Sequence, residues 1–369
     1  MKLRYKILIG VAAVFGVGLA ALAITVSYDS PCPPLRALDA GAEPIRAVMN
    51  RCYGVPEGIR LEKIARPIPP EGKVLIKVRA SSVNPAEWYG ISGRPYLIRL
   101  ESGIGAPEGD SRAGYDVAGT VEAVGANVTL FKPGDEVFGG VHGALAEYVV
   151  AREQGAIIAK PAEMSFEEAA AMPIAAITAL QGLRDQGGIM AGQKVLINGA
   201  SGGVGTYAVQ IAKAFGAEVT GVCSTRNVEL VRSLGADHVI DYTRDNFTEG
   251  NERYDLILDN VGSQGFLGME DVMKPGGIIV VVGGSKKGPF LGPIKRVVWS
   301  KLVGSFIETP VKFFLARVNK ADLELLAGLV RDGKLKSVID RRYPLEETAA
   351  ALEYLGVGHA RGKVVVTVN

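Results

Sequence analysis

The chain has 369 residues, enough for two domains that each bury a hydrophobic core. Its 41 Lys and Arg residues nearly balance its 39 Asp and Glu residues, and the net charge of +2 gives no reason to expect a nucleic-acid-binding protein. The three cysteines, Cys32, Cys52 and Cys223, lack metal-ligand spacing, and Cys32 could pair with Cys52 in an exported protein.

The first predicted element is an apolar segment, residues 7–26, in which Thr25 is the only polar residue. Twenty helical residues rise about 30 Å, the thickness of the hydrocarbon core of a bilayer. Residues 1–30 are therefore predicted to form an N-terminal transmembrane helix, as a retained single-pass anchor. A cleaved signal peptide is the alternative, but the apolar run is longer than in a usual signal peptide. Basic residues lie on both sides of the run, so the side of the membrane that the body faces stays open.

Residues 31–46 are predicted to form a linker. Short apolar segments divided by turns follow, and the clearest strands are residues 74–80, 117–124, 136–138 and 144–150. This pattern is typical of a compact β-barrel. A helix with Ser165 as its N-cap is expected at residues 165–171, and another at residues 175–183.

The most informative stretch is residues 195–205, VLINGASGGVG. An apolar strand leads into a turn rich in glycine, a helical pattern follows, and a second strand is expected at residues 218–223. Such a unit places the pyrophosphate of a dinucleotide at a helix N-terminus. The glycines allow positive φ and let a phosphate approach bare backbone N–H groups. The stretch therefore predicts a dinucleotide-binding site rather than an ordinary structural turn.

The end of the second strand predicts which dinucleotide binds. An NAD site usually has Asp or Glu about 20 residues after the glycines, where it binds the ribose 2′-OH. This chain instead has Ser224, Thr225, Arg226 and Asn227. Hydroxyls and a guanidinium suit a 2′-phosphate, so NADPH is the expected cofactor. The alternative is that Arg226 is a solvated surface residue.

Strands and helices continue to alternate after residue 223, which implies a parallel sheet with helical crossovers. The predicted strands are residues 238–242, 254–260 and 278–283, and the predicted helices are residues 227–234 and 269–273. An insertion at residues 285–320, rich in basic and aromatic residues, is expected to cover the cleft or form a dimer interface. A lipid-binding surface is the alternative. The final strand, residues 363–368, is expected to return to the barrel.

Four stretches carry a family resemblance: residues 80–88 (ASSVNPAEW), 114–125 (GYDVAGTVEAVG), 199–205 (GASGGVG) and 235–242 (GADHVIDY). They resemble the zinc-free medium-chain dehydrogenase/reductases of the quinone-oxidoreductase and enoyl-reductase branch. Similar groups are bacterial NAD(P)-dependent alcohol dehydrogenases and reticulon-interacting mitochondrial reductases. The resemblance implies an α/β fold that combines a Rossmann-type doubly wound parallel sheet with a GroES-like β-barrel catalytic domain.

The resemblance also implies domain bounds. The GroES-like catalytic domain would comprise residues 47–167 and 318–369, and the NADP-binding Rossmann domain residues 168–317. Zinc-dependent relatives have a Cys ligand and a Gly-His-Glu motif where this chain has Ser82-Val83-Asn84 and Gly114-Tyr115-Asp116. Zinc needs Cys, His or carboxylate ligands in a fixed shell, so no metal is expected.

The resemblance assigns roles residue by residue. The residues expected to hold the cofactor are Thr178, Gly199, Ser201, Gly202, Gly203, Val204, Ser224, Arg226, Tyr242, Asn260, Val261, Gly283 and Lys363. The expected catalytic residues are Asn84, Tyr89 and Asp116, and the expected substrate-lining residues are Trp88 and Tyr115. For Asp116, a structural role through hydrogen bonds to barrel backbone is an equal alternative.

The cofactor carries the hydride chemistry, so an acceptor that no metal polarises must be electrophilic by itself. A quinone or an α,β-unsaturated carbonyl meets this need, because hydride addition gives a delocalised anion. The expected function is NADPH-dependent reduction of such an acceptor or of a lipophilic aldehyde, with the proton from Tyr89, Tyr115 or solvent. The alternative is a membrane-anchored NADPH-binding scaffold or redox sensor with little turnover. Expected partners are a lipophilic small molecule, the membrane and a second copy of the chain, but no nucleic acid.

Overall fold

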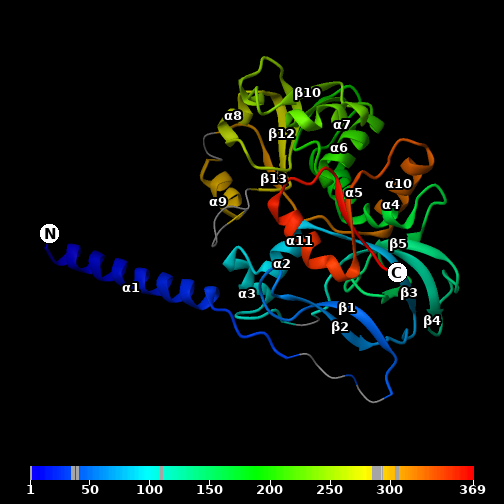
Figure 1. The fold of residues 1–369 in the computed structure, drawn as a ribbon. Coiled ribbons are helices and arrows are strands. Elements are labelled where there is room, and N and C mark those ends of the chain that lie inside the picture. Colours follow the sequence, from blue (N-terminus) through cyan, green and yellow to red (C-terminus); the bar gives the residue numbers. More distant parts are fainter. Residues whose placement is uncertain are drawn as a thin grey trace.

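The computed structural model describes residues 2–34, 38, 41–108, 111–284, 292, 294–303 and 307–369, with side chains of the N-terminal helix from Val14 onward. Two lobes form the body, and the helix α1 (Lys2–Ser27) projects away from both of them (Figure 1). We refer to the lobe built on the six-stranded sheet as the Rossmann lobe and to the other as the barrel lobe.

The Rossmann lobe contains six parallel strands in the order β10-β9-β8-β11-β12-β13. Their bounds are Lys194–Asn198 (β8), Glu218–Cys223 (β9), His238–Asp241 (β10), Tyr254–Asp259 (β11), Met273–Val281 (β12) and Val311–Phe313 (β13). The helices of this lobe include α5 (Pro173–Gln181), α6 (Gly203–Ala214), α7 (Val228–Ser233), α8 (Phe266–Glu270) and α10 (Lys320–Arg331). The strand order reverses between β8 and β11, which is where doubly wound sheets bind ligands. The predicted doubly wound fold is confirmed.

The barrel lobe contains a seven-stranded sheet in the order β14-β15-β3-β4-β5-β7, with β6 paired to β3. Its strands are Lys73–Val83 (β3), Asp116–Val124 (β4), Glu136–Gly140 (β5), Tyr148–Arg152 (β6), Ile157–Ala159 (β7), Ile339–Pro344 (β14) and Lys363–Thr367 (β15). A hairpin of β1 (Pro44–Asn50) and β2 (Ile59–Ala65) accompanies the sheet. The last strand does return to the barrel, because β15 pairs with β3 in antiparallel register.

Local pattern and structure differ at several places in these lobes. The strand predicted at residues 144–150 is β6, which begins only at Tyr148. β1 begins at Pro44, inside the segment predicted to be a linker. The helix predicted at residues 269–273 is instead α8, which ends at Glu270, and Met273 already pairs with Tyr254 of β11. Tertiary pairing with a buried neighbouring strand overrides helix propensity at this position.

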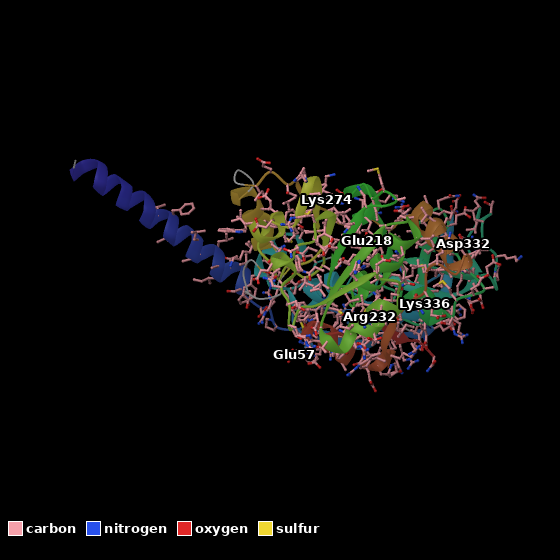
Figure 2. The ribbon with its side chains drawn as sticks, turned by 90° about the horizontal axis from the view of Figure 1, so that it is seen from above. Glu57, Glu218, Arg232, Lys274, Asp332 and Lys336 are labelled. Carbon is pink, nitrogen blue, oxygen red and sulfur yellow. A yellow bond between two sulfur atoms is a disulfide. The ribbon has the colours of Figure 1, made fainter. Side chains whose placement is uncertain are left out.

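The helix α1 stands clear of the body in both views (Figures 1 and 2). Most of its described apolar side chains are exposed, for example 74% for Val14 and 68% for Phe15, whereas Val26 near its end is buried, with 1% exposed. Among the helices whose side chains are described, none is both long and apolar enough to cross a membrane. The predicted transmembrane anchor is therefore not supported, and the first half of the predicted span lies outside the described side chains.

Arg99 fixes the end of α1 to the body. It belongs to the short helix α3 (Arg99–Ser102), and its side chain is only 2% exposed. The guanidinium donates to the carbonyl oxygens of Val26 at 3.2 Å and Tyr28 at 3.0 Å, and it pairs with Asp29 at 2.9 Å. It also lies over the ring of Tyr53. A buried cation must be paired in this way, so the chain that leaves α1 has a defined path onto the barrel lobe.

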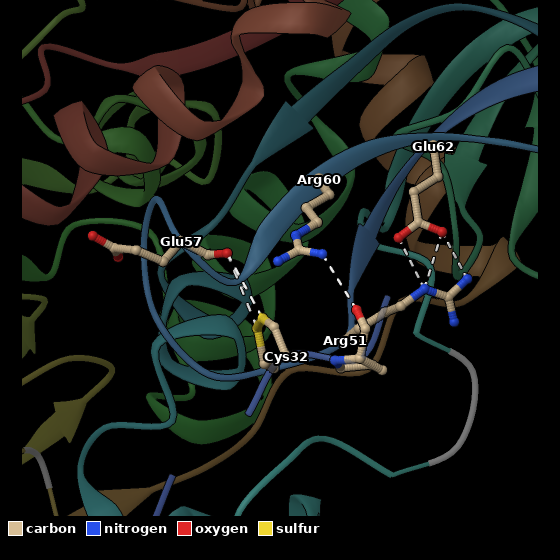
Figure 3. Close-up of a disulfide and its surroundings, with 7 residues drawn as sticks. Cys32, Arg51, Glu57, Arg60 and Glu62 are labelled. Atoms are coloured by element: carbon tan, nitrogen blue, oxygen red, sulfur yellow. Dashed lines mark hydrogen bonds and ion pairs between the residues drawn. A yellow bond between two sulfur atoms is a disulfide. The ribbon is translucent and has the colours of Figure 1, made fainter. Parts of the chain in front are cut away.

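A disulfide between Cys32 and Cys52 crosslinks the segment after α1 to the barrel lobe (Figure 3). The two Cα atoms are 5.1 Å apart. Arg60 donates to the carbonyl oxygen of Pro33 at 3.3 Å beside the disulfide. The sequence allowed this pairing but did not predict it.

Candidate active site

The glycine turn between β8 and α6 contains two kinds of glycine. Gly199 has φ +80°, and a Cβ there would lie 2.6 Å from Cγ2 of Val261, so packing within the protein requires glycine. A Cβ on Gly202 or Gly203 would come no closer than 3.5 Å and 3.3 Å to its neighbours. Packing within the protein therefore does not require glycine at Gly202, and the bare backbone there suits the approach of a phosphate to the N-terminus of α6, whereas the Lys363 side chain already lies close to Gly203.

Two buried amide oxygens near this turn have no hydrogen-bond partner within the described ranges, Oδ1 of Asn227 and Oδ1 of Asn260. The Asn227 side chain donates instead to Oγ of Ser201 at 2.9 Å and to Oγ of Ser224 at 3.2 Å. Buried polar atoms normally have partners, so the two oxygens are free to accept from a bound molecule with several hydroxyl or amide donors. The residues present therefore fit a nicotinamide dinucleotide.

The residues predicted to bind the 2′-phosphate follow two adjacent strands, β9 and β10. The Arg226 guanidinium donates to the carbonyl oxygen of His359 at 3.0 Å, and the Tyr242 side chain is exposed. Asp241 was not predicted from the sequence, and its carboxylate accepts from Oγ1 of Thr225 at 2.5 Å. This hydrogen bond is the main cause that lowers the pKa of Asp241. The carboxyl ends of parallel strands lie at one edge of a sheet. Asp241 ends β10, next to the end of β9, so this rule could have predicted that it lies near Thr225.

Asn260 and Val261 follow β11, and Gly283 follows β12. A Cβ on Gly283 would lie 2.1 Å from the carbonyl oxygen of Asn260, so glycine permits this close approach. Asp259, the last residue of β11 and the neighbour of Asn260, is fully buried. Its carboxylate pairs with Arg296 of α9 (Ile294–Val303). This ion pair was not predicted from the sequence, because Arg296 lies within the irregular insertion.

Asn84, Asp116 and Lys363 form a buried cluster at the ends of three barrel strands. Nζ of Lys363 donates to Oδ1 of Asn84 at 2.5 Å and lies 3.4 Å from Oδ2 of Asp116. Nδ2 of Asn84 donates to the same carboxylate oxygen at 2.9 Å, and Ser82 does so at 2.6 Å. The structure therefore brings together two predicted catalytic residues and one predicted cofactor residue.

Asp116 also joins the two lobes. Its Oδ1 accepts the backbone N–H of Ile174 at 3.0 Å, in the first turn of α5. Thr178 of the same helix donates to the carbonyl oxygen of Ile174 at 2.7 Å. The backbone partner of Asp116 is thus a helix N-terminus of the other lobe, which favours a negative charge.

The cluster lies beside the glycine turn. Gly202 forms a parallel backbone bridge with Gly362, directly before Lys363. The Lys363 side chain passes Gly203, because a Cβ there would lie 3.3 Å from Cδ of the lysine. The predicted cofactor turn and the predicted catalytic residues therefore meet at the interface between the lobes.

The aromatic residues predicted on the substrate side lie in the segments that follow Asn84 and precede Asp116. Trp88 and Tyr89 lie in α2 (Pro85–Ser92) with ring centroids 5.4 Å apart, and Trp88 packs against Gly356 of α11 (Thr348–Val357). Burial raises the pKa of Tyr89 to about 12. Burial and the nearby Asp116 carboxylate also raise the pKa of Tyr115. Both phenols are therefore weak acids at neutral pH.

Within the described residues, no group of three or more His, Cys, Asp or Glu side chains is arranged to hold a metal ion.

Two family descriptions match the chain. The Alcohol dehydrogenase GroES-like domain matches residues 70–162, and the family described as Zinc-binding dehydrogenase matches residues 234–366. The first match covers β3 to β7 of the barrel lobe, and the second runs from before β10 of the Rossmann lobe into β15 of the barrel lobe.

Whole-chain comparisons agree with these matches. The chain is 36% identical to the 2-methylene-furan-3-one reductase of Solanum lycopersicum, over 85% of this chain and 76% of that protein. It is 35% identical to the chloroplast envelope quinone oxidoreductase homolog of Arabidopsis thaliana, over 86% of this chain and 96% of that protein. The quinone oxidoreductase structure from Coxiella burnetii has a TM-score of 0.76 at 32% identity, and the match covers 89% of this chain and 100% of that one. The chain therefore belongs to the medium-chain dehydrogenase/reductase family and is an NAD(P)-dependent type of oxidoreductase.

Proposed function

We propose that the protein is a zinc-independent, NADPH-dependent reductase that transfers hydride to a quinone or an α,β-unsaturated carbonyl. The observation that carries the proposal is the contact of Lys363 with both halves of the site. Its stem passes the glycine turn, and its ammonium group donates to Asn84 at 2.5 Å. A cofactor bound at the turn would thus lie beside the polar groups of the barrel lobe.

The bound nicotinamide would supply the hydride. Ser201, Gly202 and Gly203 would hold the pyrophosphate, and the free Oδ1 of Asn260 would accept from the nicotinamide end. The protein's own contribution is orientation of the two reactants and exclusion of water from the interface. Asn84 holds the Lys363 ammonium group in place there, and this positive charge stabilises negative charge that develops on an acceptor oxygen.

The side chains at the positions of the zinc ligands favour an activated acceptor. Ser82 and Asn84 both donate to Asp116, so these groups are engaged with one another. With no Lewis acid from them, the acceptor must provide its own electrophilicity, as quinones and enones do. The names of the tomato and Arabidopsis relatives, a 2-methylene-furan-3-one reductase and a quinone oxidoreductase homolog, agree with this acceptor class.

The preference for NADPH rests on the basic residues beside the end of β9. The guanidinium of Arg226 is hydrogen-bonded to the carbonyl oxygen of His359, in the loop before β15. The exposed Arg361 lies in the same loop. We expect NADPH to bind about tenfold more tightly than NADH or better, because hydrogen bonds between charged groups are worth about 1.5–3 kcal/mol. The Arg226→Glu variant should lose this preference. Equal affinities of the wild type for the two cofactors would contradict the assignment.

The reaction is tested by following NADPH absorbance with a panel of quinones, enones, aldehydes and simple ketones. Consumption with quinones or enones, but not with simple ketones, is the expected result. NADPH binding without turnover across the panel would instead indicate a cofactor-binding scaffold or sensor.

The cofactor site is tested by Gly202→Ala, with Gly265→Ala as the matched control. Both glycines are helix N-caps in extended backbone, with φ −84° and −73°, and neither has a neighbour that a Cβ would strike. Stability should change by less than about 1 kcal/mol in both variants. Only Gly202→Ala should weaken NADPH binding, by about tenfold or more, because the methyl group blocks the phosphate. Equal binding by the two variants would contradict the site.

The proposed partners are a lipophilic acceptor, a membrane surface and a second copy of the chain. Flotation of the full chain with anionic and neutral vesicles tests the membrane, and sedimentation equilibrium tests the second copy. Recovery of a monomer in the vesicle-free fraction would contradict both of these partners.

A further inference from the structure

A second carboxyl group, that of Glu87, lies next to the buried cluster of Asn84, Asp116 and Lys363. The proposed function assigns no role to it. Its Oε2 accepts the backbone N–H of Asn84 at 2.8 Å, at the start of α2. Its Oε1 is shut off from solvent and has no hydrogen-bond partner in the described part of the chain. A carboxylate with a buried and unpartnered oxygen is strongly unfavourable, so the geometry favours a proton on Oε1.

The charges around Glu87 lead to the same conclusion. Asp116 from β4 and Lys363 from β15 are the charged groups that act on it. On α11, which packs against α2, Tyr354 is bonded to Asp340 and Glu353 is exposed. The cluster therefore has two carboxyl groups and one ammonium group, and a proton on Glu87 makes it neutral. Burial, with repulsion from Asp116, raises the pKa of Glu87 to about 8.

We propose that Glu87 is the proton donor of the reductase and gives the acceptor the proton held on Oε1. This inference rests on the proposed function. A reduced nicotinamide cofactor gives its hydride, and with it two electrons, to the enone or quinone. The resulting enolate or quinol anion then takes the Oε1 proton, so one O–H bond breaks at Glu87 and one C–H or O–H bond forms on the product. Glu87 is left as a carboxylate and regains a proton from water that enters the site once the product has left.

The nearby phenols are weaker candidates for this role. A group donates best when its pKa lies near the working pH. The pKa of Glu87 meets this condition, whereas burial raises the pKa of Tyr89 to about 12. Glu87 also shares a hydrogen bond with Asn84, which lies on the substrate side of the cluster.

The experiment compares the wild type with Glu87→Gln and with the matched control Glu168→Gln. Glutamine keeps the acceptor for the Asn84 N–H and so preserves the helix start, but it has no acidic proton. Glu168 holds the same position in α4 (Phe166–Ala170), where it accepts the N–H of Ser165 at 2.9 Å, and it lies outside the cluster.

The wild type should lose kcat as the pH rises through about 8, where Glu87 loses its proton. Glu87→Gln should lower kcat about 100-fold at pH 7 and remove this pH dependence, with the Kd for NADPH unchanged. Glu168→Gln should behave as the wild type does. Wild-type kcat with the same pH dependence in Glu87→Gln would overturn the donor role while the proposed function stands.

A second readout does not depend on turnover. Infrared difference spectra of the cofactor-free protein should show the band of a protonated carboxyl group that disappears above about pH 8 and is absent in Glu87→Gln. Absence of this band in the wild type at pH 7 would also overturn the proposal. A wild type that reduces no acceptor in the panel would overturn the proposed function itself, and the donor role with it, even if the band is present.

Discussion

Asp116 of the barrel lobe and Asp259 of the Rossmann lobe are both fully buried near the interface between the lobes. Each accepts hydrogen bonds from an asparagine side chain and from at least one backbone N–H group, and each has one basic partner. Asp116 pairs with Lys363, and Asp259 pairs with Arg296. The two sites thus share one arrangement of donors.

The difference between the two sites is Glu87. It adds a second carboxyl group beside Asp116, whereas Asp259 and Arg296 form a balanced pair. A balanced buried pair has only a structural role, since it neither needs nor releases a proton. A buried cluster with one excess carboxyl group must hold a proton or pay a high energetic cost, and this property suits a reaction that consumes protons.

The largest effect is expected from Lys363→Met. The substitution leaves Asp116 and Glu87 without a cation among the described neighbours, and breaking a buried pair typically costs about 3–5 kcal/mol. Urea unfolding of the cofactor-free full chain at pH 7 measures this loss. Lys334→Met is the control, because that lysine and its partner Asp332 are both more than half exposed. A loss no larger than in the control would show that the cluster is not held by this charge.

Arg296→Met should cost less, about 2–3 kcal/mol, although it also strands a buried carboxylate. Oδ1 of Asp259 still accepts from Asn198 at 2.8 Å and from the Gly262 N–H at 2.9 Å. The same urea measurement tests this value. An equal loss of stability in Lys363→Met and Arg296→Met would show that the additional carboxyl group of Glu87 does not make the two sites differ in stability.

The pH dependence of stability should separate the two sites further. Between the ordinary pKa of 4.5 and the raised value of about 8, the folded protein holds a proton on Glu87 that the unfolded chain has lost. The free energy of unfolding of the wild type should therefore fall as pH rises through this window and level off above it. The full rise in pKa corresponds to about 5 kcal/mol, and we expect roughly 2 kcal/mol because the side chain is only partly shielded.

Glu87→Gln should remove this contribution and leave the balanced site untouched. Thermal unfolding of both proteins from pH 5 to pH 9 provides the comparison. Parallel stability curves for the wild type and the variant would contradict the proton on Glu87.

Local patterns in the sequence predicted most of the secondary structure. The strand at residues 218–223 has the predicted bounds, and Ser165 caps its helix as expected. The glycine turn was also recognised, because turn chemistry and apolar periodicity depend on neighbours within a few residues. The helix predicted at residues 269–273 was wrong in its bounds, since pairing of Met273 with β11 is not a local property.

The candidate site was predicted as a list of residues, and its electrostatics were not. Asn84, Asp116 and Lys363 were named from the family resemblance, but their hydrogen bonds join positions up to 279 residues apart. Glu87 was missed because its surroundings, not its residue type, raise its pKa. The basic partner of Asp259 was missed because Arg296 lies in a segment without a regular pattern and reaches Asp259 only through the tertiary fold.

The sequence by itself therefore determined the two-lobed part of the fold class, the glycine turn and the family, since each depends on short segments with a fixed local geometry. Tertiary structure decided the pairing of Cys32 with Cys52, the partners of the two buried aspartates and the excess carboxyl group at Glu87. These features depend on burial and on charges from distant segments, and both exist only once the lobes are packed together.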